Sequence, residues 1–365
     1  MTREELLALK IKPINKKIEK EVKAIWDGIA KPLDGLGEFE LLLARIGGIL
    51  ESTDLNLQKK AIIVMCADNG IVAEHVSQSG QEVTAIVTSF MGKQQSSVGK
   101  MAAHAGVDVI PVDIGINSAE KIPGVRDCKI MQGTRDFLEE PAMTEEEALC
   151  AIEVGIQLVQ ECKDKGYTLL GTGEMGIGNT TTSSAVAIAL MEKDDTDLVA
   201  LERWIGRGAG LSDAGLQRKA QVIKSALEKY PVAHMDTLQI LATFGGLDIA
   251  GMAGVCIGGA LYHIPVILDG LISTLAGLVA QRLVPGVQEF LIPSHCSKEP
   301  AARLLADELQ LHPVIDANLA LGEGTGAVMM CELLDLALTL YEKQTTFDTM
   351  EIEQYERFSD KDGVR

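Results

Sequence analysis

The sequence predicts an α/β fold, with a mostly parallel open sheet and helices on both of its faces. Apolar runs at 61–66, 107–113, 167–170, 265–269 and 289–293 predict strands, and the run at 61–66 is typical of a strand covered on both sides. Stretches of helical periodicity lie between these runs, and strands that alternate with helices form parallel sheets. With 365 residues, 47% of them hydrophobic, the chain can bury a large core.

The chain is predicted to begin with helices. Ile18, Val22 and Trp26 recur at helical spacing within residues 1–55. The turn at 31–37 separates two helices, the second of which runs through 41–43. On composition alone, this turn is a plain connection between helices.

The first strand, 61–66, ends in the turn Ala67-Asp-Asn-Gly70. Helical stretches follow from about 81 to 104, and then the strand at 107–113. The next helix is expected over 144–162, with Thr144 as its N-cap and Glu147 three positions later, which is the spacing of a capping box.

A glycine-rich turn at 173–182 is expected to join a strand to a helix. It follows the apolar run at 167–170 and precedes the alanine-rich run at 183–190. Gly176 and Gly178 let the backbone approach a ligand, and a phosphate suits the free N–H groups of the helix start. The turn has neither the lysine of a nucleotide-triphosphate loop nor a dinucleotide fingerprint. Glu174 is expected inside this turn, beside the anion.

The rest of the chain continues the alternation. A second glycine cluster at 206–212 precedes a helix that carries Lys219. The helix at 236–262 is expected to break at 245–246, and the uncharged stretch at 249–268 predicts a buried helix and a strand, because Pro265 and glycines interrupt it. The segment 322–326 is expected to open the last long helix. The charged tail from about 348 is expected to fray.

The carboxyl ends of parallel strands meet at one edge of a sheet, where open α/β sheets bind their ligands. The turns at 68–70, 173–182, 269–270 and 293–297 are all expected at this edge. Residues 59–325 would form the α/β domain. Residues 1–58 and 326–365 would form a small helical domain built from both chain ends.

Composition excludes several classes of partner. The net charge of −19 argues against nucleic acid and anionic membranes, and the low aromatic content of 4% argues against single-strand binding. Seven cysteines without a C-x-x-C pair fit reduced thiols in a cytoplasm. The charged amino terminus does not resemble a signal peptide. We therefore expect a cytoplasmic protein without a membrane segment.

Four features are expected to meet in one cleft: the turn at 176–181, the glycines at 206–210, the pair Ser294-His295, and Glu323 between two glycines. Thiol chemistry at Cys296 is disfavoured, because neighbouring residues of a strand point to opposite faces. Asp68 and His75 could be metal ligands, but the sequence has no second group of carboxylates and histidines at a spacing that suits a metal. We therefore expect neither a metal nor another cofactor. On sequence alone, a single glutamate in a turn is more often a helix cap or a solvated side chain than a catalytic group.

Several of these segments resemble the nicotinate-nucleotide–dimethylbenzimidazole phosphoribosyltransferase family, often called CobT. The similar stretches run in the family's order from about residue 30 to 330. They are Lys31-Pro-Leu-Asp-Gly-Leu-Gly37, Ala67-Asp-Asn-Gly-Ile71, Gln81-Glu-Val-Thr84, Gly173 to Thr182, Gly206-Arg-Gly-Ala-Gly-Leu211, Ser294-His-Cys-Ser-Lys-Glu-Pro300 and Leu321-Gly-Glu-Gly-Thr-Gly326. The resemblance implies a three-layer, Rossmann-like α/β fold with a small helical domain, assembled as a dimer.

The resemblance also implies an activity and a set of site residues. The family transfers the phosphoribosyl group of nicotinate mononucleotide to an aromatic base, giving an α-ribazole phosphate and nicotinate. Glu323 matches the catalytic base and Glu174 a second active-site glutamate. The phosphoribosyl group would be bound by Gly176, Ile177, Gly178, Asn179, Thr180, Thr181, Gly208, Lys219, Ser297 and Gly322. The acceptor base would be bound by Ser79, Gln81, Val87 and Leu321.

Three departures from the family pattern leave the acceptor open. Asn69 stands where many members carry histidine, Gly80 where proline is usual, and Val87 where glutamine or methionine often faces the acceptor. Dimethylbenzimidazole, another benzimidazole, an adenine or a phenolic acceptor all fit, and the dimer could pair this chain with itself or with a paralogue. One alternative is a dinucleotide-binding α/β enzyme, but the sequence lacks the glycine fingerprint of that class. The other is a binding subunit without activity, and the presence of Glu323 argues against it, because an inactive subunit could lose this residue.

Overall fold

The computed structural model describes residues 1–192 and 201–357. Its centre is a six-stranded sheet in the order β3-β2-β1-β4-β5-β6, and every neighbouring pair is parallel. The strands are β1 (Lys60–Ala67), β2 (Asp108–Gly115), β3 (Arg126–Asp127), β4 (Leu169–Met175), β5 (Val266–Leu268) and β6 (Leu291–Pro293).

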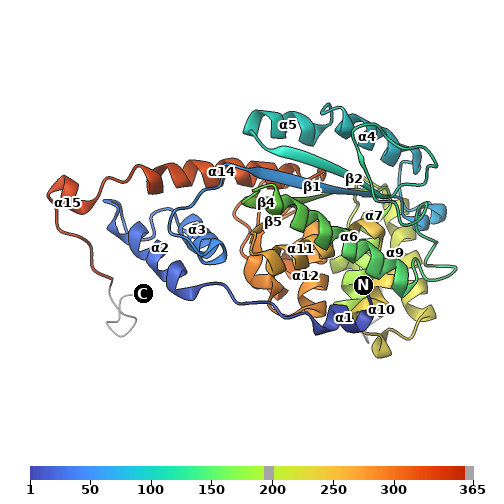
Figure 1. The fold of residues 1–365 in the computed structure, drawn as a ribbon. Helices are drawn as coiled ribbons and strands as arrows, with labels where there is room; N and C mark the ends of the chain where they lie inside the picture. Colours follow the sequence, from blue (N-terminus) through green and yellow to red (C-terminus); the bar gives the residue numbers. More distant parts are fainter. Residues whose placement is uncertain (193–200, 358–365) are drawn as a thin grey trace.

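Helices cover both faces of the sheet, as Figure 1 shows. One face packs against α6 (Glu145–Asp164), α11 (Leu247–Tyr262) and α12 (Leu271–Leu283), and the other against α4 (Glu82–Gly92), α5 (Ser97–Ala105) and α14 (Thr325–Glu342). Alternate residues of β1 enter the two cores: Ile63 and Met65 one, Ile62 and Val64 the other. The predicted three-layer α/β fold is therefore confirmed.

The remaining described elements complete the molecule around these layers. They are α1 (Arg3–Ala8), α2 (Lys16–Gly28), α3 (Glu38–Leu50), η1 (Gly70–Glu74), α7 (Asn179–Met191), η2 (Glu202–Trp204), α9 (Asp213–Lys229), η3 (Val232–His234), α10 (Thr237–Phe244), η4 (Val287–Phe290), α13 (Ala301–Glu308) and α15 (Phe347–Met350). Among the described residues, no helix combines the length and apolar character needed to cross a membrane.

The glycine-rich stretch at 249–262 forms a buried helix, as predicted, and its glycines have a packing reason. A Cβ on Gly155 of α6 would collide with the backbone oxygen of Gly251 in α11. A Cβ on Gly254 would collide with the oxygen of Ile152. The two helices therefore approach more closely than larger side chains would allow.

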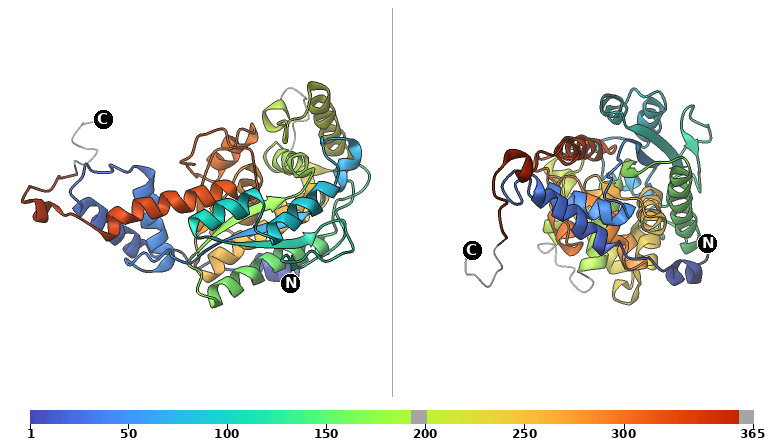
Figure 2. Two further views of the ribbon diagram at one scale, coloured as in Figure 1. Left: turned by 90° about the horizontal axis from the view of Figure 1, so that it is seen from above. Right: turned by 60° about the vertical axis from the view of Figure 1, so that its left-hand side comes forward.

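Helices from both halves of the chain form an arm at one end of the molecule, whereas the amino terminus itself lies on the main body. Figures 1 and 2 show α2, α3, α15 and the far half of α14 projecting from the sheet, whereas α1 lies against the main body, where Arg3 pairs with Glu145 and Asp236. This arm shares its core with the sheet, because Val22 and Trp26 belong to one cluster with Ile62 and Val64. The division into domains at 58 and 325 stays a prediction, and residues 358–365 of the expected tail lie outside the described residues.

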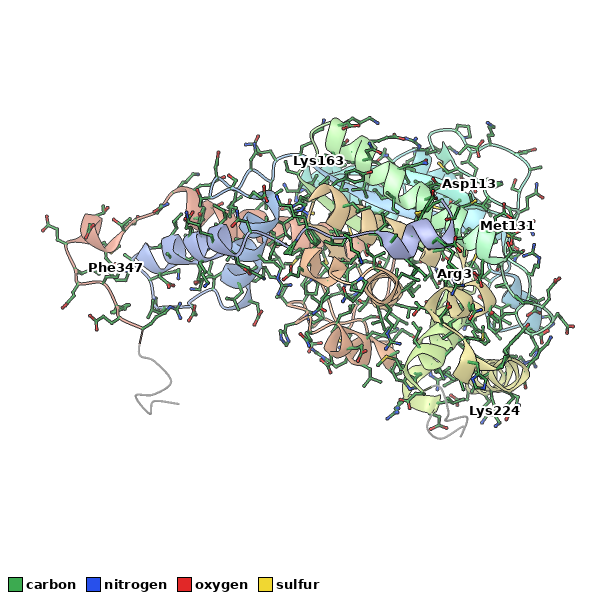
Figure 3. All side chains as sticks on the ribbon, turned by 60° about the horizontal axis from the view of Figure 1, so that its bottom comes forward. Arg3, Asp113, Met131, Lys163, Lys224 and Phe347 are labelled. Carbon is green, nitrogen blue, oxygen red and sulfur yellow. The ribbon has the colours of Figure 1, made fainter. Side chains whose placement is uncertain are left out.

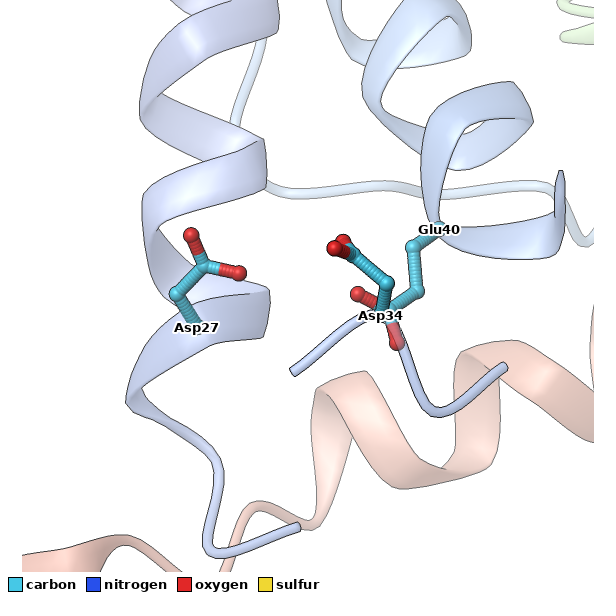
Figure 4. A group of neighbouring side chains, drawn as sticks. All are labelled: Asp27, Asp34 and Glu40. Carbon is cyan, nitrogen blue, oxygen red and sulfur yellow. The ribbon is translucent and has the colours of Figure 1, made fainter. Parts of the chain in front are cut away.

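The turn at 31–37 is held by a network of charges. Glu40, fully buried in the first turn of α3, accepts hydrogen bonds from Lys31 Nζ at 2.6 Å, Lys23 Nζ at 3.1 Å and the backbone N–H of Leu36 at 3.0 Å. Arg357 pairs with both Asp27 and Asp34. The oxygens of Asp27, Asp34 and Glu40 lie within 4.8 Å of one another (Figure 4). Because Lys23, Lys31 and Arg357 already neutralise these carboxylates, the cluster has a structural role: it holds the turn in place.

Most predicted elements are present within a few residues of the expected positions. The capping box of Thr144 and Glu147 forms, and the long helix breaks into α10 and α11 at Gly245-Gly246. The strand expected at 289–293 is shorter, since 287–290 is a turn of 3₁₀ helix and only Leu291–Pro293 joins the sheet. The molecule carries many polar and charged side chains on its outer surface, as Figure 3 shows.

The prediction that Glu174 lies in a turn is wrong. The strand expected at 167–170 instead runs from Leu169 to Met175, so Glu174 belongs to β4 and pairs with Met65 of β1. The glycines inside the strand misled the prediction. They are needed because another segment lies against β4: a Cβ on Gly173 would lie 2.6 Å from the backbone oxygen of Glu323.

Candidate active site

A cavity of about 310 Å³ opens at the carboxyl edge of the sheet. The strand order reverses between β1 and β4, because the chain builds β2 and β3 on one side of β1 before it crosses to β4. Ligands of open α/β sheets bind at this kind of switch point. The cavity is lined by the end of β4 and the start of α7, by residues 269–273, by the loops around 208, 297 and 321, and by Val87.

The floor of the cavity is the turn between β4 and α7. Gly178 precedes the helix with a φ of +95°, and α7 has no side-chain cap on its first N–H groups. Gly176 has no room for a side chain, because a Cβ there would lie 2.6 Å from the oxygen of Ala67 and 2.7 Å from Oδ2 of Asp248. An uncapped helix start beside a glycine turn is a site for an anion.

A buried lysine ties the two glycine segments together. Lys219 of α9 is fully buried, and its Nζ donates to Oγ1 of Thr180 at 3.1 Å and to the oxygen of Gly206 at 2.9 Å. Burial lowers the pKa of Lys219 to about 8, while the nearby charge of Glu299 opposes this shift. Lys219 therefore puts positive charge directly behind the start of α7.

Glu299 contacts the glycine segment at 206–208. Its Oε1 accepts the backbone N–H of Gly208 at 3.0 Å, and its Oε2 is buried against Gly206 without a partner among the described residues. Sequence reasoning placed Glu299 only within a similar motif and assigned it no role.

Glu174 stands at the end of β4, facing the cavity. Burial raises its pKa to about 8, and the charges of Asp248, Asp269 and Glu323 act in the same direction. The side-chain amide of Asn179 donates to its Oε2 and partly offsets this rise. In the free protein, Glu174 is therefore mostly protonated at neutral pH.

Glu323 lies on a loop with an uncommon backbone. Gly322, Glu323 and Gly324 have φ values of +82°, +60° and +88°, so a non-glycine residue occupies the left-handed region between two glycines. Oε2 of Glu323 accepts the backbone N–H of Val98 at 3.0 Å, in the first turn of α5. The segment 322–326 opens α14 as expected, with Gly324 as N-cap and Thr325 as first residue, but the carboxylate of Glu323 points to α5 and not to this helix.

Asp269 caps the start of α14, a role that was the structural alternative for Glu323. Its Oδ1 accepts the N–H of Gly326 at 2.7 Å and that of Ala327 at 3.1 Å, so it fixes the start of α14 and with it the loop of Glu323. Burial raises the pKa of Asp269 to about 7. In the sequence, Asp269 is recognisable only as a residue of the turn that follows a buried strand.

His295 also lines the cavity, whereas Cys296 does not. Nδ1 of His295 lies 3.1 Å from Oγ of Ser294, which donates to the oxygen of Asp269. Burial lowers the pKa of His295 to about 4, so the ring is neutral at physiological pH. It can hydrogen-bond to a ligand but brings no charge.

The structure gathers most of the predicted site residues around the cavity. Those that line it are Glu174, Gly176, Ile177, Asn179, Thr180, Gly208, Ser297, Gly322, Glu323, Val87 and Leu321. Thr181 and Lys219 are buried behind it, and Gly178 faces an adjoining cavity of about 70 Å³.

Two predicted acceptor residues are not brought to this cavity. Gln81 lines a neighbouring depression, where its side chain donates to the oxygen of Asn69 at 3.1 Å and accepts from Asn117 at 2.9 Å. Ser79 lies in the loop before α4, with its N–H bonded to Oγ of Ser77 at 3.2 Å. Among the predicted acceptor residues, Val87 and Leu321 supply the apolar wall of the cavity.

Together, these groups form a cavity with two different ends. One end offers the N–H groups of α7 and a buried cation, which suit a phosphate. The other end has the carboxylates of Glu174, Asp269 and Glu323, which favour a positive charge on a bound ring or sugar. The arrangement suits a substrate that is anionic at one end and cationic at the other.

Comparison with known proteins agrees with this geometry. The model of a phosphoribosyltransferase family, DBI_PRT, matches residues 11–352. The nicotinate-nucleotide–dimethylbenzimidazole phosphoribosyltransferase of Clostridium acetobutylicum is 40% identical over 345 residues, which cover 94% of this chain and 96% of the relative. The protein of the same name from Acetivibrio thermocellus is 42% identical and covers 90% of this chain and 92% of its own.

The fold is also similar to that of a solved member. The crystal structure of CobT from Thermus thermophilus superposes with a TM-score of 0.84 at 32% identity, covering 93% of this chain and all of that one. Both the matched length and the identity are sufficient to assign the family. The chain belongs to the nicotinate-nucleotide–dimethylbenzimidazole phosphoribosyltransferase family.

Proposed function

We propose that the protein transfers the 5-phosphoribosyl group of nicotinate mononucleotide to 5,6-dimethylbenzimidazole or a related aromatic base, giving α-ribazole 5′-phosphate and nicotinate. The observation that carries the proposal is the cavity itself, in which an uncapped helix start and two glutamates meet. The phosphate of the donor suits the helix start, and its cationic pyridinium suits the glutamates. The names of the relatives support the same reaction.

The reaction needs one proton transfer. A ring nitrogen of the acceptor forms a bond to the anomeric carbon, while the bond from that carbon to the pyridinium nitrogen breaks and its electron pair returns to nicotinate. Attack from the opposite face turns the β linkage into an α linkage. The leaving group departs without protonation, and the acceptor's other nitrogen loses its proton to Glu323. This chemistry calls for no metal.

Glu323 suits the role of general base because its carboxylate lines the cavity and, among the described residues, accepts one N–H, that of Val98. Glu174 would stabilise the positive charge that develops on the ribose, in its ionised form. The start of α7, with Gly176 to Thr181, would bind the 5′-phosphate, helped by Gly208, Lys219, Ser297 and Gly322. Val87 and Leu321 would contact the flat face of the acceptor.

The assay is incubation of the purified chain with nicotinate mononucleotide and dimethylbenzimidazole, with nicotinate and the α anomer of the product measured by chromatography and NMR. Turnover by this chain alone would also exclude an inactive binding subunit. No nicotinate release with any of the four acceptor classes would contradict the proposal.

Glu323→Gln tests the assigned base. The variant should lose kcat by roughly 10²–10⁴ with donor binding nearly unchanged. Its melting temperature should stay close to the wild-type value, because the amide oxygen can still accept from Val98. Glu351→Gln is the matched control, since Glu351 is an exposed glutamate with a similar φ of +56°. A Glu323→Gln variant with full activity would contradict the assignment.

We also infer that the protein is a dimer. Met329, Leu333, Leu336 and Leu340 form an apolar stripe on α14, with Leu336 exposed to 70% of its surface. The stripe continues into a groove between α5 and α14 that is lined by Met101. A patch of this kind is typical of an interface.

The free thiols of all seven cysteines support a cytoplasmic location.

A further inference from the structure

Beneath the floor of the cavity lies a carboxylate to which neither the reaction nor the similar motifs assign a role. Asp248 is fully buried in the first turn of α11. Its Oδ1 accepts the N–H of Ile249 at 3.0 Å, and its Oδ2 lies directly under the position that a Cβ on Gly176 would occupy. Asp248 therefore supports the glycine turn from below without reaching the cavity.

Asp248 is joined to Glu174 through a single amide. Nδ2 of Asn179 donates to Oδ2 of Asp248 at 3.0 Å and also to Oε2 of Glu174. An amide nitrogen has two hydrogens, so both donors of Asn179 are used. Because both acceptors are carboxylates, the orientation of this amide is fixed: the reversed amide would set its oxygen against them.

The same residue also begins α7. The backbone of Asn179 is the first residue of the helix whose N–H groups face the proposed phosphate site. Its side chain therefore connects the phosphate end of the cavity to the carboxylate end. On the far side, Oδ1 of Asn69 accepts from Thr182 Oγ1 at 3.2 Å, which anchors the next turn of α7 to the same buried layer.

We infer that Asp248 is a positioning residue: through Asn179, it holds the side chain of Glu174 in place and sets the protonation of that carboxylate. The inference rests on the proposed function only for what Glu174 does, and not for how it is held.

The charges around the pair give the inference a direction. Glu174 faces Asp248, Asp269 and Glu323, and their negative charges add to the effect of burial in raising its pKa. Asp248 itself faces Asn179, its own helix start and, more remotely, Asp68. Burial raises the pKa of Asp248 to about 6, so its charge is present at neutral pH. Removing that charge should lower the pKa of Glu174, and removing the amide of Asn179 should raise it.

The test measures this pKa in the free protein, where no substrate is needed. Glutamate carboxyl carbons are labelled with ¹³C, the signal of Glu174 is assigned with Glu174→Gln, and its titration is followed by NMR. We expect Asp248→Asn to move the midpoint of Glu174 to lower pH and Asn179→Ala to move it to higher pH. Opposite shifts distinguish this linkage from general loosening, which would move both variants in one direction.

Activity supplies the second readout. Asp248→Asn should leave Glu174 more ionised, but Asn179 would lose the carboxylate that fixes it and would hold Glu174 less well. We therefore expect kcat to fall by about tenfold or more, while KM for nicotinate mononucleotide stays within about threefold of the wild-type value. Asp113→Asn is the matched control. Asp113 is a buried aspartate at the end of β2 that accepts the N–H of Ile116 at 2.9 Å and pairs with Lys129. Whatever its effect on stability, this control should leave the titration of Glu174 and kcat unchanged.

An Asp248→Asn variant with a lower melting temperature but an unshifted Glu174 would show that Asp248 only stabilises the fold, and would overturn the inference. If this variant does not fold, Asn179→Ala decides alone, because an unchanged or lower midpoint for Glu174 contradicts the linkage. A wild-type protein without transferase activity would contradict the proposed function, while the NMR titration would still test the role of Asp248.

Discussion

At the scale of single residues, the carboxylates at the cavity differ in what holds them. Glu323 receives one backbone N–H, whereas Glu174 shares an amide and is surrounded by three other acidic groups. In the free protein, Glu174 is mostly protonated at pH 7, because its pKa is raised to about 8. A role in stabilising positive charge requires the ionised form. The substrate must therefore change the state of this residue as it binds.

We predict that nicotinate mononucleotide releases up to one proton on binding between about pH 7 and 8. The cationic pyridinium favours the ionised carboxylate and so lowers the pKa of Glu174. Calorimetry in two buffers with different ionisation enthalpies measures the number of protons released. Ribose 5-phosphate, which lacks the pyridinium, should release fewer. Release that persists in Glu174→Gln would assign the proton to another group.

Prediction from sequence succeeded for residues inside compact motifs and failed for those held only by tertiary contacts. Glu174 and Glu323 lie between glycines, and this local pattern exposed them. Asp248 and Asp269 stand alone beside apolar runs, and no neighbour in the sequence indicates that they meet Asn179 or the start of α14. Ser79 and Gln81 were assigned by resemblance, and this chain places them outside the cavity.

At the scale of secondary-structure elements, the start of α7 is the part that most directly selects a substrate. It combines a left-handed Gly178, uncapped N–H groups and the buried Lys219. Each of these features favours an anion over a neutral group. The strand and the helix were both expected from the sequence. The exact end of β4 was not, because a glycine within a strand has the same local signature as one in a turn.

We predict that nicotinate riboside, which lacks the 5′-phosphate, is used with kcat/KM at least about 10² lower than the mononucleotide. The loss corresponds to about two charge-assisted hydrogen bonds. Lys219→Met should lower kcat/KM for the mononucleotide and leave kcat/KM for the riboside nearly unchanged. The preference for the mononucleotide over the riboside should therefore become smaller. Equal use of both donors by the wild-type protein would mean that the start of α7 does not bind the phosphate.

At the scale of the whole molecule, α14 connects the site to the projecting arm. Its first turn is fixed by Asp269 beside the cavity, and its far half packs with α2 and α3, where Arg357 joins the carboxyl-terminal segment to Asp27 and Asp34 (Figure 1). The parallel sheet and its layers followed from the alternation of apolar runs and helices, whereas this alternation does not specify the order of the strands. The arm contains helices of the small helical domain expected from residues 1–58 and 326–365, and that division stays a prediction.

We predict that Leu336→Glu combined with Leu340→Glu converts a dimer into a monomer. Both side chains are exposed on the stripe of α14, so the charges should be tolerated by the fold and rejected by an apolar interface. Light scattering after gel filtration gives the mass. Leu7→Glu is the control, since Leu7 is an exposed leucine on α1, away from the stripe. A wild-type protein that is monomeric at all concentrations would contradict the prediction.

The left-handed backbone at Glu323 has a consequence for how this protein can change over time. A side chain in that region destabilises the folded chain by about 1 kcal/mol relative to glycine, which adopts the conformation freely. A screen for thermal tolerance alone would therefore favour glycine or asparagine at position 323, and would discard the proposed base in doing so. The most stable version of this loop and the most active one are different sequences, and only selection for turnover keeps the glutamate.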